Sequence, residues 1–344
     1  MTRTLTRRTT AADVAREAGV SPATVGFVLN RTKGQTISEE TRARVLAAVE
    51  VLNYKPHHAA RALRSGKSKI VLLVLPDWPL EHSLRTNLEA LTHTLGDNGY
   101  ALITFTPQPH SSATPLWAVL EPAVVIGYKP FSAEDLAELK ALGIRNIIPN
   151  PETPGMGAAA DLESGPRLQA EHLLSLGHTK LGFACPPDPR LAAFVKTRLD
   201  VVTRVCIRAG LSSPVVRQVD YRDGSGPSAA AHWVAEGVTG VVAYNDDVAA
   251  DVIAGAVRSG LSVPGDLCVV GHDNSPLASR YIPSISSVEI DMESLGKQSA
   301  HLALNLAEGY PMPASPLSAA SLVHRESTTH TTRNDSVLRK SPRS

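Results

Sequence analysis

From residue 69 onward, short apolar runs alternate with segments of helical periodicity, and this alternation constrains the fold more than any other feature. Residues 70–75 form a continuous apolar run, which is typical of a parallel strand buried on both faces. Leucines at 84, 88, 91 and 95 then keep helical spacing. Further strands are expected at residues 100–104, 124–126, 144–148, 180–183, 240–244 and 267–271. Two such arrays predict two α/β doubly wound lobes, with a ligand cleft at the carboxyl ends of facing sheets.

The first 56 residues follow a different pattern, in which helix-start and helix-stop signals recur at short intervals. Thr10 and Asp13 form a capping box, and Gly19 suits the left-handed end of the helix that they open. Ser21 and Pro22 then restart a helix, and a third helix begins near Ser38. Two helices joined by a short glycine-containing turn predict a helix-turn-helix unit within an all-α domain.

Charge is distributed unevenly along the chain. Residues 1–69 carry 13 basic and 5 acidic residues, a net charge of +8, whereas the remainder carries 21 basic and 28 acidic residues, a net charge of −7. A basic N-terminal segment followed by an acidic remainder indicates that a polyanionic partner binds residues 1–69 alone.

Length and composition exclude several classes of protein. A chain of 344 residues with 43% hydrophobic and 19% charged residues is typical of a globular protein with two or three domains. No apolar run reaches the roughly 18 residues of a membrane helix, and no apolar segment behind the first charges marks an export signal. Three widely spaced cysteines form no metal-ligand pair, so we expect buried thiols, no metal site and no cofactor.

The N-terminal sequence resembles the lactose-repressor (LacI/GalR) family of bacterial regulators. The similarity covers residues 12–25, beginning Ala-Asp-Val-Ala and ending Pro-Ala-Thr-Val, and Val-Leu-Asn at 28–30. It continues through residues 37–42, 45–49, 52–54 and 56. The resemblance implies that the second helix of the predicted helix-turn-helix lies in the major groove of DNA.

The resemblance also implies which side chains contact DNA. Pro22 and Ala23 are expected at the base-reading start of the second helix. Polar side chains are expected near phosphates: Thr10, Ser21, Thr24, Asn30 and Ser38. Gly26 and Phe27 stand where the family usually has Ser-Arg. Phe27 is expected to press on a thymine methyl group instead of binding guanine, which predicts a different base preference at that step.

Residues 57–68 resemble the family's hinge helix. A helix of this length is too short to be stable alone in water, so it is expected to order on DNA. Small residues such as Ala60 would let two hinges pack closely in a dimer, and Leu63 is expected to wedge into the minor groove. The alternative is a plain basic linker.

The rest of the chain resembles the family's effector domain, a two-lobed fold similar to periplasmic binding proteins. The match includes Glu-His-Leu-Leu at 171–174, Tyr-Asn-Asp at 244–246 and Val-Val-Gly-His-Asp at 269–273. It places residues 69–163 and 291–322 in the first lobe and residues 164–290 and 323–330 in the second. Residues 331–344 are polar without apolar periodicity, which predicts a disordered tail.

The resemblance implies that Arg198, Asn245 and Asp273 bind the effector. Asp161, which this chain shares with the family, is expected to bind it as well. A guanidinium, an amide and a carboxylate together suit a polyhydroxylated, sugar-like ligand. Trp78, after the first strand, could stack on a sugar or a nucleobase. The alternatives are cap or turn roles for Asn245 and Asp273, a surface ion pair for Arg198 and packing for Trp78.

Together these features predict a cytoplasmic transcription regulator, a repressor by family default and nucleoid-associated when bound. It would bind a palindromic operator in double-stranded DNA as a homodimer under the control of a small-molecule effector. An enzyme is the first alternative, but the sequence has no dinucleotide-binding, phosphate-loop or nucleophile-elbow motif. A transport-type solute-binding protein is the second alternative, and it would have an export signal and no helix-turn-helix.

Overall fold

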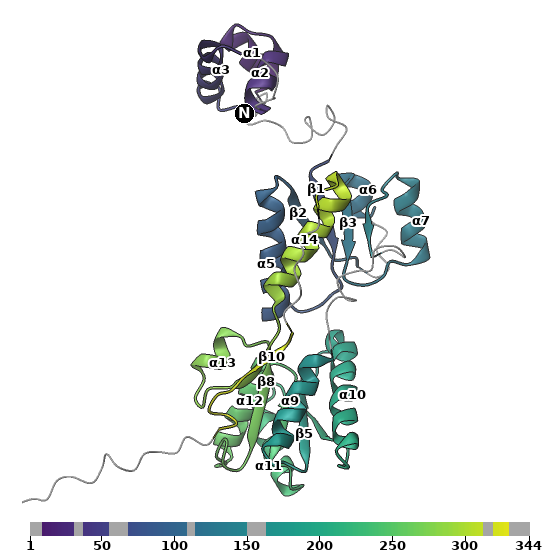
Figure 1. The fold of residues 1–344 in the computed structure, drawn as a ribbon, viewed down its shortest axis with the longest axis vertical. Coiled ribbons are helices and arrows are strands. Elements are labelled where there is room, and N and C mark those ends of the chain that lie inside the picture. The colour runs from purple at the N-terminus through teal and green to yellow at the C-terminus, as the bar shows by residue number, and fades with distance from the viewer. Residues whose placement is uncertain are drawn as a thin grey trace, which may run out of the picture. The chain divides into compact units, whose positions relative to one another are not determined.

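The computed structural model describes residues 9–30, 37–54, 68–108, 114–149, 163–311 and 319–329. The chain forms two compact units, Met1–Lys69 and Ile70–Ser344, and Figure 1 traces both along the sequence. Of the hinge predicted at 57–68 only Ser68 is described, and the predicted tail lies outside the described residues.

Three helices make up the described part of the first unit: α1 (Ala11–Ala18), α2 (Pro22–Asn30) and α3 (Glu39–Val51). The predicted helix starts are confirmed, because Thr10 and Asp13 form a reciprocal capping box and Ser38 Oγ accepts a hydrogen bond from Thr41 N at 3.2 Å. Gly19 ends α1 in the left-handed conformation, with φ of 63°.

The apolar faces of these helices meet in one small core. Its buried members are Val14, Ala15, Ala18, Val25, Val28, Val45 and Ala48. Leu46, which follows Val45 in α3, is 49% exposed because consecutive residues of a helix point in different directions. The core therefore joins α1, α2 and α3 through a few mostly small side chains.

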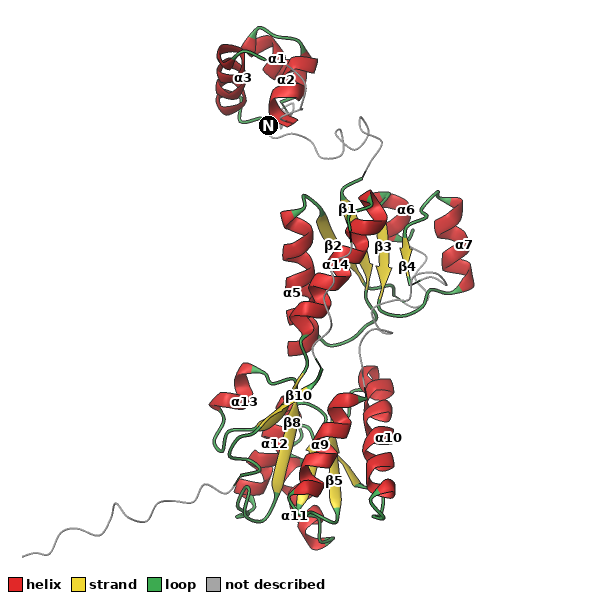
Figure 2. Cartoon of the chain, in the orientation of Figure 1, coloured by secondary structure: helices red, strands yellow, loops and turns green. Residues whose placement is uncertain are grey.

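The second unit begins with a parallel α/β lobe, here called the first lobe (Figure 2). Its elements are β1 (Ile70–Val74), α5 (His82–Asp97), β2 (Ala101–Phe105), α6 (Leu116–Leu120), β3 (Val124–Gly127), α7 (Ala133–Ala141), β4 (Ile147–Ile148) and α14 (Met292–Glu308). The strand order in the described sheet is β2-β1-β3-β4. Helices α5 and α14 cover the face that carries Val71 and Leu73, and α6 and α7 cover the face that carries Leu72.

The second lobe has the same doubly wound character. Its elements are α9 (Ser164–Ser175), β5 (Leu181–Cys185), η1 (Pro189–Leu191), α10 (Ala192–Arg208), β6 (Val215–Gln218), α11 (Gly226–Ala235), β7 (Gly240–Ala243), α12 (Asp246–Arg258), β8 (Cys268–His272), α13 (Pro276–Arg280), β9 (Ser286–Glu289) and β10 (Ser321–Val323). The described strands follow the order β10-β9-β8-β7-β5-β6, all parallel except β10. Helices α9 and α10 pack on one face, and α11 and α12 pack on the other.

The described strands differ from the sequence-based expectation in several places, because β6, β9 and β10 were not expected and one expected strand is shorter. The strand expected at 144–148 is only Ile147–Ile148, because Ile144 N donates to Leu139 O at 3.0 Å and so completes the end of α7. Ser321 pairs with Glu289 in the second sheet, so the chain has returned to the second lobe by residue 321 and not at 323. No helix in the described ranges has the length and apolar character needed to cross a membrane.

Candidate functional site

The second helix of the first unit presents a mixed face at its start. Pro22 and Phe27 are exposed and Ala23 is half-buried, whereas Val25 and Val28 face the core. Phe27 is 36% exposed, so part of its ring is accessible on α2. The expected base-reading residues therefore lie on one accessible side of α2.

The hydroxyl groups expected near phosphates have local roles in the structure. Ser21 Oγ accepts from Thr24 N at 3.1 Å and lies 2.9 Å from Thr24 Oγ1, and Thr10 and Ser38 cap their own helices. Each of these hydroxyls lies at the amino end of a helix, where unpaired N–H groups and the helix dipole also favour anions. The side chain of Asn30, like Ala60 and Leu63, lies outside the described residues.

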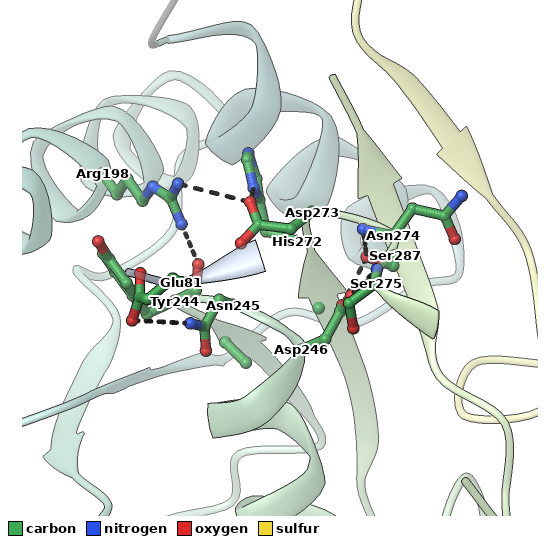
Figure 3. A network of polar contacts seen from close by, with 12 residues as sticks. Glu81, Arg198, Tyr244, Asn245, Asp246, His272, Asp273, Asn274, Ser275 and Ser287 are labelled. Atoms are coloured by element: carbon green, nitrogen blue, oxygen red, sulfur yellow. Dashed lines mark hydrogen bonds and ion pairs between the residues drawn. The ribbon is translucent and has the colours of Figure 1, made fainter. Parts of the chain in front are cut away.

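The second candidate region lies where the second lobe's strands end, and Figure 3 shows the side chains gathered there. Arg198, from α10, extends between two strand ends. Its Nη1 donates to Tyr244 O, its Nη2 lies 4.0 Å from Asp273 Oδ1, and its Cζ lies 4.3 Å from the centre of the Tyr244 ring. The guanidinium is therefore held by a carbonyl, a carboxylate and an aromatic face, so Arg198 is not an isolated surface ion pair.

Asn245 has two distinct contacts. Its Oδ1 accepts from Val248 N at 2.9 Å, which caps α12, and its Nδ2 donates to Glu81 Oε1 at 3.2 Å. The capping alternative is thus correct for one end of the amide. The other end reaches Glu81, which belongs to the first lobe.

Asp273 is fixed by its neighbour. It adopts a left-handed φ of 94°, and its Oδ1 lies 2.6 Å from His272 Nδ1. Burial lowers the pKa of His272, so this ring is neutral and its Nδ1–H donates to the carboxylate. Burial alone would raise the pKa of Asp273, but that hydrogen bond and the charge of Arg198 outweigh it and keep the pKa below its usual value. The site thus holds an ionised Asp273 beside Arg198.

Asp246, which the sequence analysis did not single out as a site residue, ties the strand-end loops together. Its Oδ2 accepts from Ser275 N and its Oδ1 from Ser287 Oγ, each at 2.6 Å. Burial raises the pKa of Asp246 to about 6 despite these bonds. A buried amide, Gln169 of α9, donates to the carbonyls of Ala243 and Gly271 at 2.9 and 2.8 Å. These contacts position Asn245 and Asp273 on neighbouring strands.

Trp78 lies among aromatic side chains. Its ring meets Phe194 of the second lobe edge-on at 4.8 Å and Tyr128 of the first lobe at 5.9 Å, and Lys129 Nζ lies 5.4 Å from its centre. Packing thus accounts for much of its surface. Asp161 lies outside the described residues.

A cavity of about 420 Å³ opens beside Asp273 and is lined by both lobes. His82, Ser83 and Thr86 of α5 line one side, and Asp273 and Asn274 line the other. A smaller hollow of about 240 Å³ on the outer side of α5 contains none of the predicted site residues. In the described part of the chain no cluster of His, Cys, Asp or Glu side chains is arranged to hold a metal ion.

Glu81 is the residue that sequence reasoning missed beside these strand ends, where it accepts from Asn245 Nδ2. Burial raises its pKa to about 7, the nearby Asp273 carboxylate adds to the shift, and Arg198 opposes it. The position of Glu81 in the loop after the first strand could have indicated it, because the loops at the carboxyl ends of parallel strands carry ligand-binding residues. No motif distinguishes it from other charged loop residues.

Family comparisons match both units. Residues 10–57 match the model for bacterial regulatory proteins of the lacI family, and residues 170–328 match a periplasmic binding protein-like domain. The chain is 30% identical to the transcriptional regulator MalR of Streptomyces coelicolor, covering 88% of this chain and 92% of that one. It is 29% identical to the regulator GalR of Escherichia coli K12, covering 88% and 90%.

Solved structures agree with this assignment. The fold is similar to that of the lac repressor dimer bound to operator and the anti-inducer ONPF, with a TM-score of 0.73 at 25% identity. The similarity covers 94% of this chain and 99% of that one. Because helix-turn-helix, effector lobes and whole-length similarity coincide, the chain belongs to the lacI family of DNA-binding bacterial transcription regulators, with a ligand-binding effector domain.

Proposed function

We propose that this protein is a cytoplasmic repressor that binds a palindromic DNA operator as a homodimer. Support comes from the net charge of +8 over residues 1–69, from the accessible start of α2 and from the similarity to a lac repressor dimer bound to operator. A dimer presents two recognition helices to two half-sites, which a palindrome matches. Ala60 and Leu63 are proposed minor-groove contacts of the hinge.

Phe27 carries the prediction about sequence preference. Its exposed ring on α2 can contact a thymine methyl group, whereas it offers no hydrogen bonds to guanine. Selection of bound DNA from a random pool by the full chain should return a palindrome with a thymine preference at this step. Phe27→Ala should lose that preference, whereas Leu46→Ala, equally apolar and exposed on α3, should keep it. Full guanine preference at the step would contradict the assignment.

We propose further that the cleft binds a small hydroxylated effector through Arg198, Asn245 and Asp273. The observation that carries this proposal is the convergence of these three groups at the strand ends. Of the three, Asp273 also lines the cavity of about 420 Å³. A sugar-like hydroxyl can donate to the Asp273 carboxylate and accept from the guanidinium or the amide. A nucleobase-like ligand is the second candidate, because the part of the Trp78 ring that its neighbours leave accessible could stack on a base.

A thermal-shift screen of sugars, polyols and nucleobases tests the effector site. A true effector raises the unfolding temperature of the full chain, and the rise grows with the logarithm of one plus the ratio of the ligand concentration to Kd. Arg198→Ala should abolish that rise, whereas Arg204→Ala, an exposed change one and a half turns further along α10, should preserve it. Equal stabilisation of both variants would place the ligand elsewhere. We assign no catalytic step to any of these residues.

A further inference from the structure

The loop that joins β1 to α5, residues 75–81, makes side-chain contacts with the second lobe and is here called the strap. Asp77 Oδ1 lies 3.5 Å from Arg190 Nη1, the Trp78 ring meets Phe194, and Glu81 Oε1 accepts from Asn245 Nδ2. Ser83, just beyond the strap, lines the same cavity as Asp273. The two lobes are thus bridged by the protein's own side chains where a ligand would bridge them.

These contacts differ in strength. The Asp77 and Arg190 side chains are 72% and 44% exposed, and Arg190 already pairs with Asp188 at 2.6 Å, so that pair contributes little. The Glu81 contact is different because Asn245 is buried and held in place by its capping bond. Glu81 is therefore the strap residue whose chemistry most affects closure.

The charges around Glu81 come from four segments of the second lobe. Asp188 precedes η1, Asp247 belongs to α12 and Asp273 follows β8, whereas Arg198 of α10 is the cation among them. Three carboxylates against one guanidinium, together with burial, disfavour an ionised Glu81 while the strap is docked.

We propose that residues 75–81 are a proton-controlled strap, which docks on Asn245 and closes the two lobes when Glu81 is protonated and releases them when Glu81 ionises. A carboxylic acid carries its proton on one oxygen and still accepts from the Asn245 amide with the other. In the released state Glu81 is hydrated and loses the neighbouring carboxylates. Docking and proton binding are therefore linked.

The direction of this linkage follows from the pKa of Glu81. The docked pKa is about 7 and the ordinary value is 4.5, so docking is favoured fully below 4.5 and the advantage is lost as pH rises through 7. Between pH 4.5 and 7 this difference in the pKa of Glu81 changes the equilibrium between the docked and released strap by about 100-fold, after a reduction for the partial exposure of the carboxyl group.

The strap also competes with a ligand for Asn245, a consequence that rests on the proposed effector site. Asn245 Nδ2 carries two N–H donors, and Glu81 occupies one of them. An effector that uses this same donor must displace Glu81, and displacement is easier where Glu81 is ionised. The strap itself requires neither effector nor DNA.

The test measures the distance between the lobes in the ligand-free full chain. Spin labels are placed at Lys140→Cys in α7 and Ala193→Cys in α10, both exposed, whereas Cys185, Cys206 and Cys268 are buried. Double electron–electron resonance should give one short distance at pH 5.5 and a growing longer distance at pH 8.5. Circular dichroism of each variant checks its folding.

Three variants distinguish the strap from other titrating groups. Glu81→Gln accepts the same bond without ionising, so it should keep the short distance at both pH values. Glu81→Ala should weaken closure at both, and Glu89→Gln, an exposed change on α5, should behave like the parent. Identical distances in the parent at both pH values, or a pH response retained by Glu81→Gln, would overturn the proposal. Because no effector or DNA is present, this result is independent of the proposed function.

Discussion

Substitution of Gly271 tests whether the hydrogen bonds that Asp246 accepts from Ser275 and Ser287 stabilise the second lobe. A Cβ atom added at Gly271 would overlap with Asp246 Oδ1 and lie 3.2 Å from Ile285 Cγ2. Asp246 cannot move freely because its two oxygens accept from Ser275 N and Ser287 Oγ. Gly271→Ala must therefore displace the carboxylate and weaken at least one of these bonds.

The cost can be estimated from the bonds at risk. A buried hydrogen bond to a carboxyl group contributes about 1.5–3 kcal/mol, and local overpacking adds to it, so Gly271→Ala should lower the free energy of unfolding by about 2–4 kcal/mol. Gly96→Ala is the matched control, because Gly96 is exposed in α5 with open space around it. That change should stabilise the chain by about 0.5–1 kcal/mol.

Urea unfolding of the second unit, followed by tryptophan fluorescence, measures both variants. Trp117 is buried in the first lobe and Trp233 in the second, so the emission reports unfolding of both lobes. A lower free energy of unfolding for Gly271→Ala together with a higher one for Gly96→Ala would confirm that the contact with Asp246 determines the effect of the change. A free energy of unfolding for Gly271→Ala within about 0.5 kcal/mol of the parent would show that the Asp246 carboxylate adjusts to the added methyl group without losing its bonds.

Two further predictions concern stability. Val45→Ala, in the core of the first unit, should lower the free energy of unfolding of that unit alone by about 2 kcal/mol, as measured by hydrogen exchange. Val51→Ala, on the same helix but 74% exposed, should lower it little. Equal effects of the two changes would contradict the assigned core. His172 contacts Thr328 Oγ1 at 3.0 Å, and burial lowers its pKa to about 4. Its stabilising contribution is therefore present above pH 6.5 and lost as pH falls toward 4. Relative to the parent, His172→Gln should flatten the loss of stability between pH 6.5 and 4 in chemical denaturation, and an unchanged pH profile would refute this role.

Local sequence signals predicted the elements that local contacts determine. Thr10 and Asp13 lie three residues apart, so their capping box can be read directly from the chain. Alternation of apolar runs and helical periods likewise predicted two doubly wound lobes. Ile144 shows the limit, because its amide could either pair in a strand or complete a helix end, and the helix end prevailed.

The candidate site depended on contacts between residues far apart in the sequence. Glu81 and Asn245 are 164 residues apart, and Asp246 bonds Ser287 across 41 residues. A carboxylate in a loop gives no sign of such a partner until the strand order is known. The family resemblance supplied Arg198, Asn245 and Asp273, but it could not supply Glu81, whose role depends on how this chain's own strap is folded.

If a ligand in the cleft controls DNA binding, then DNA must in turn change the affinity for that ligand, and a reciprocal titration measures both effects. The affinity of the full chain for its selected palindrome is measured with and without the compound found by thermal shift. The compound's affinity is then measured with and without that DNA. Coupling between the sites requires the same factor in both directions, and we expect about 5-fold or more. If both affinities are unchanged, the cleft and the helix-turn-helix act independently and the account is contradicted.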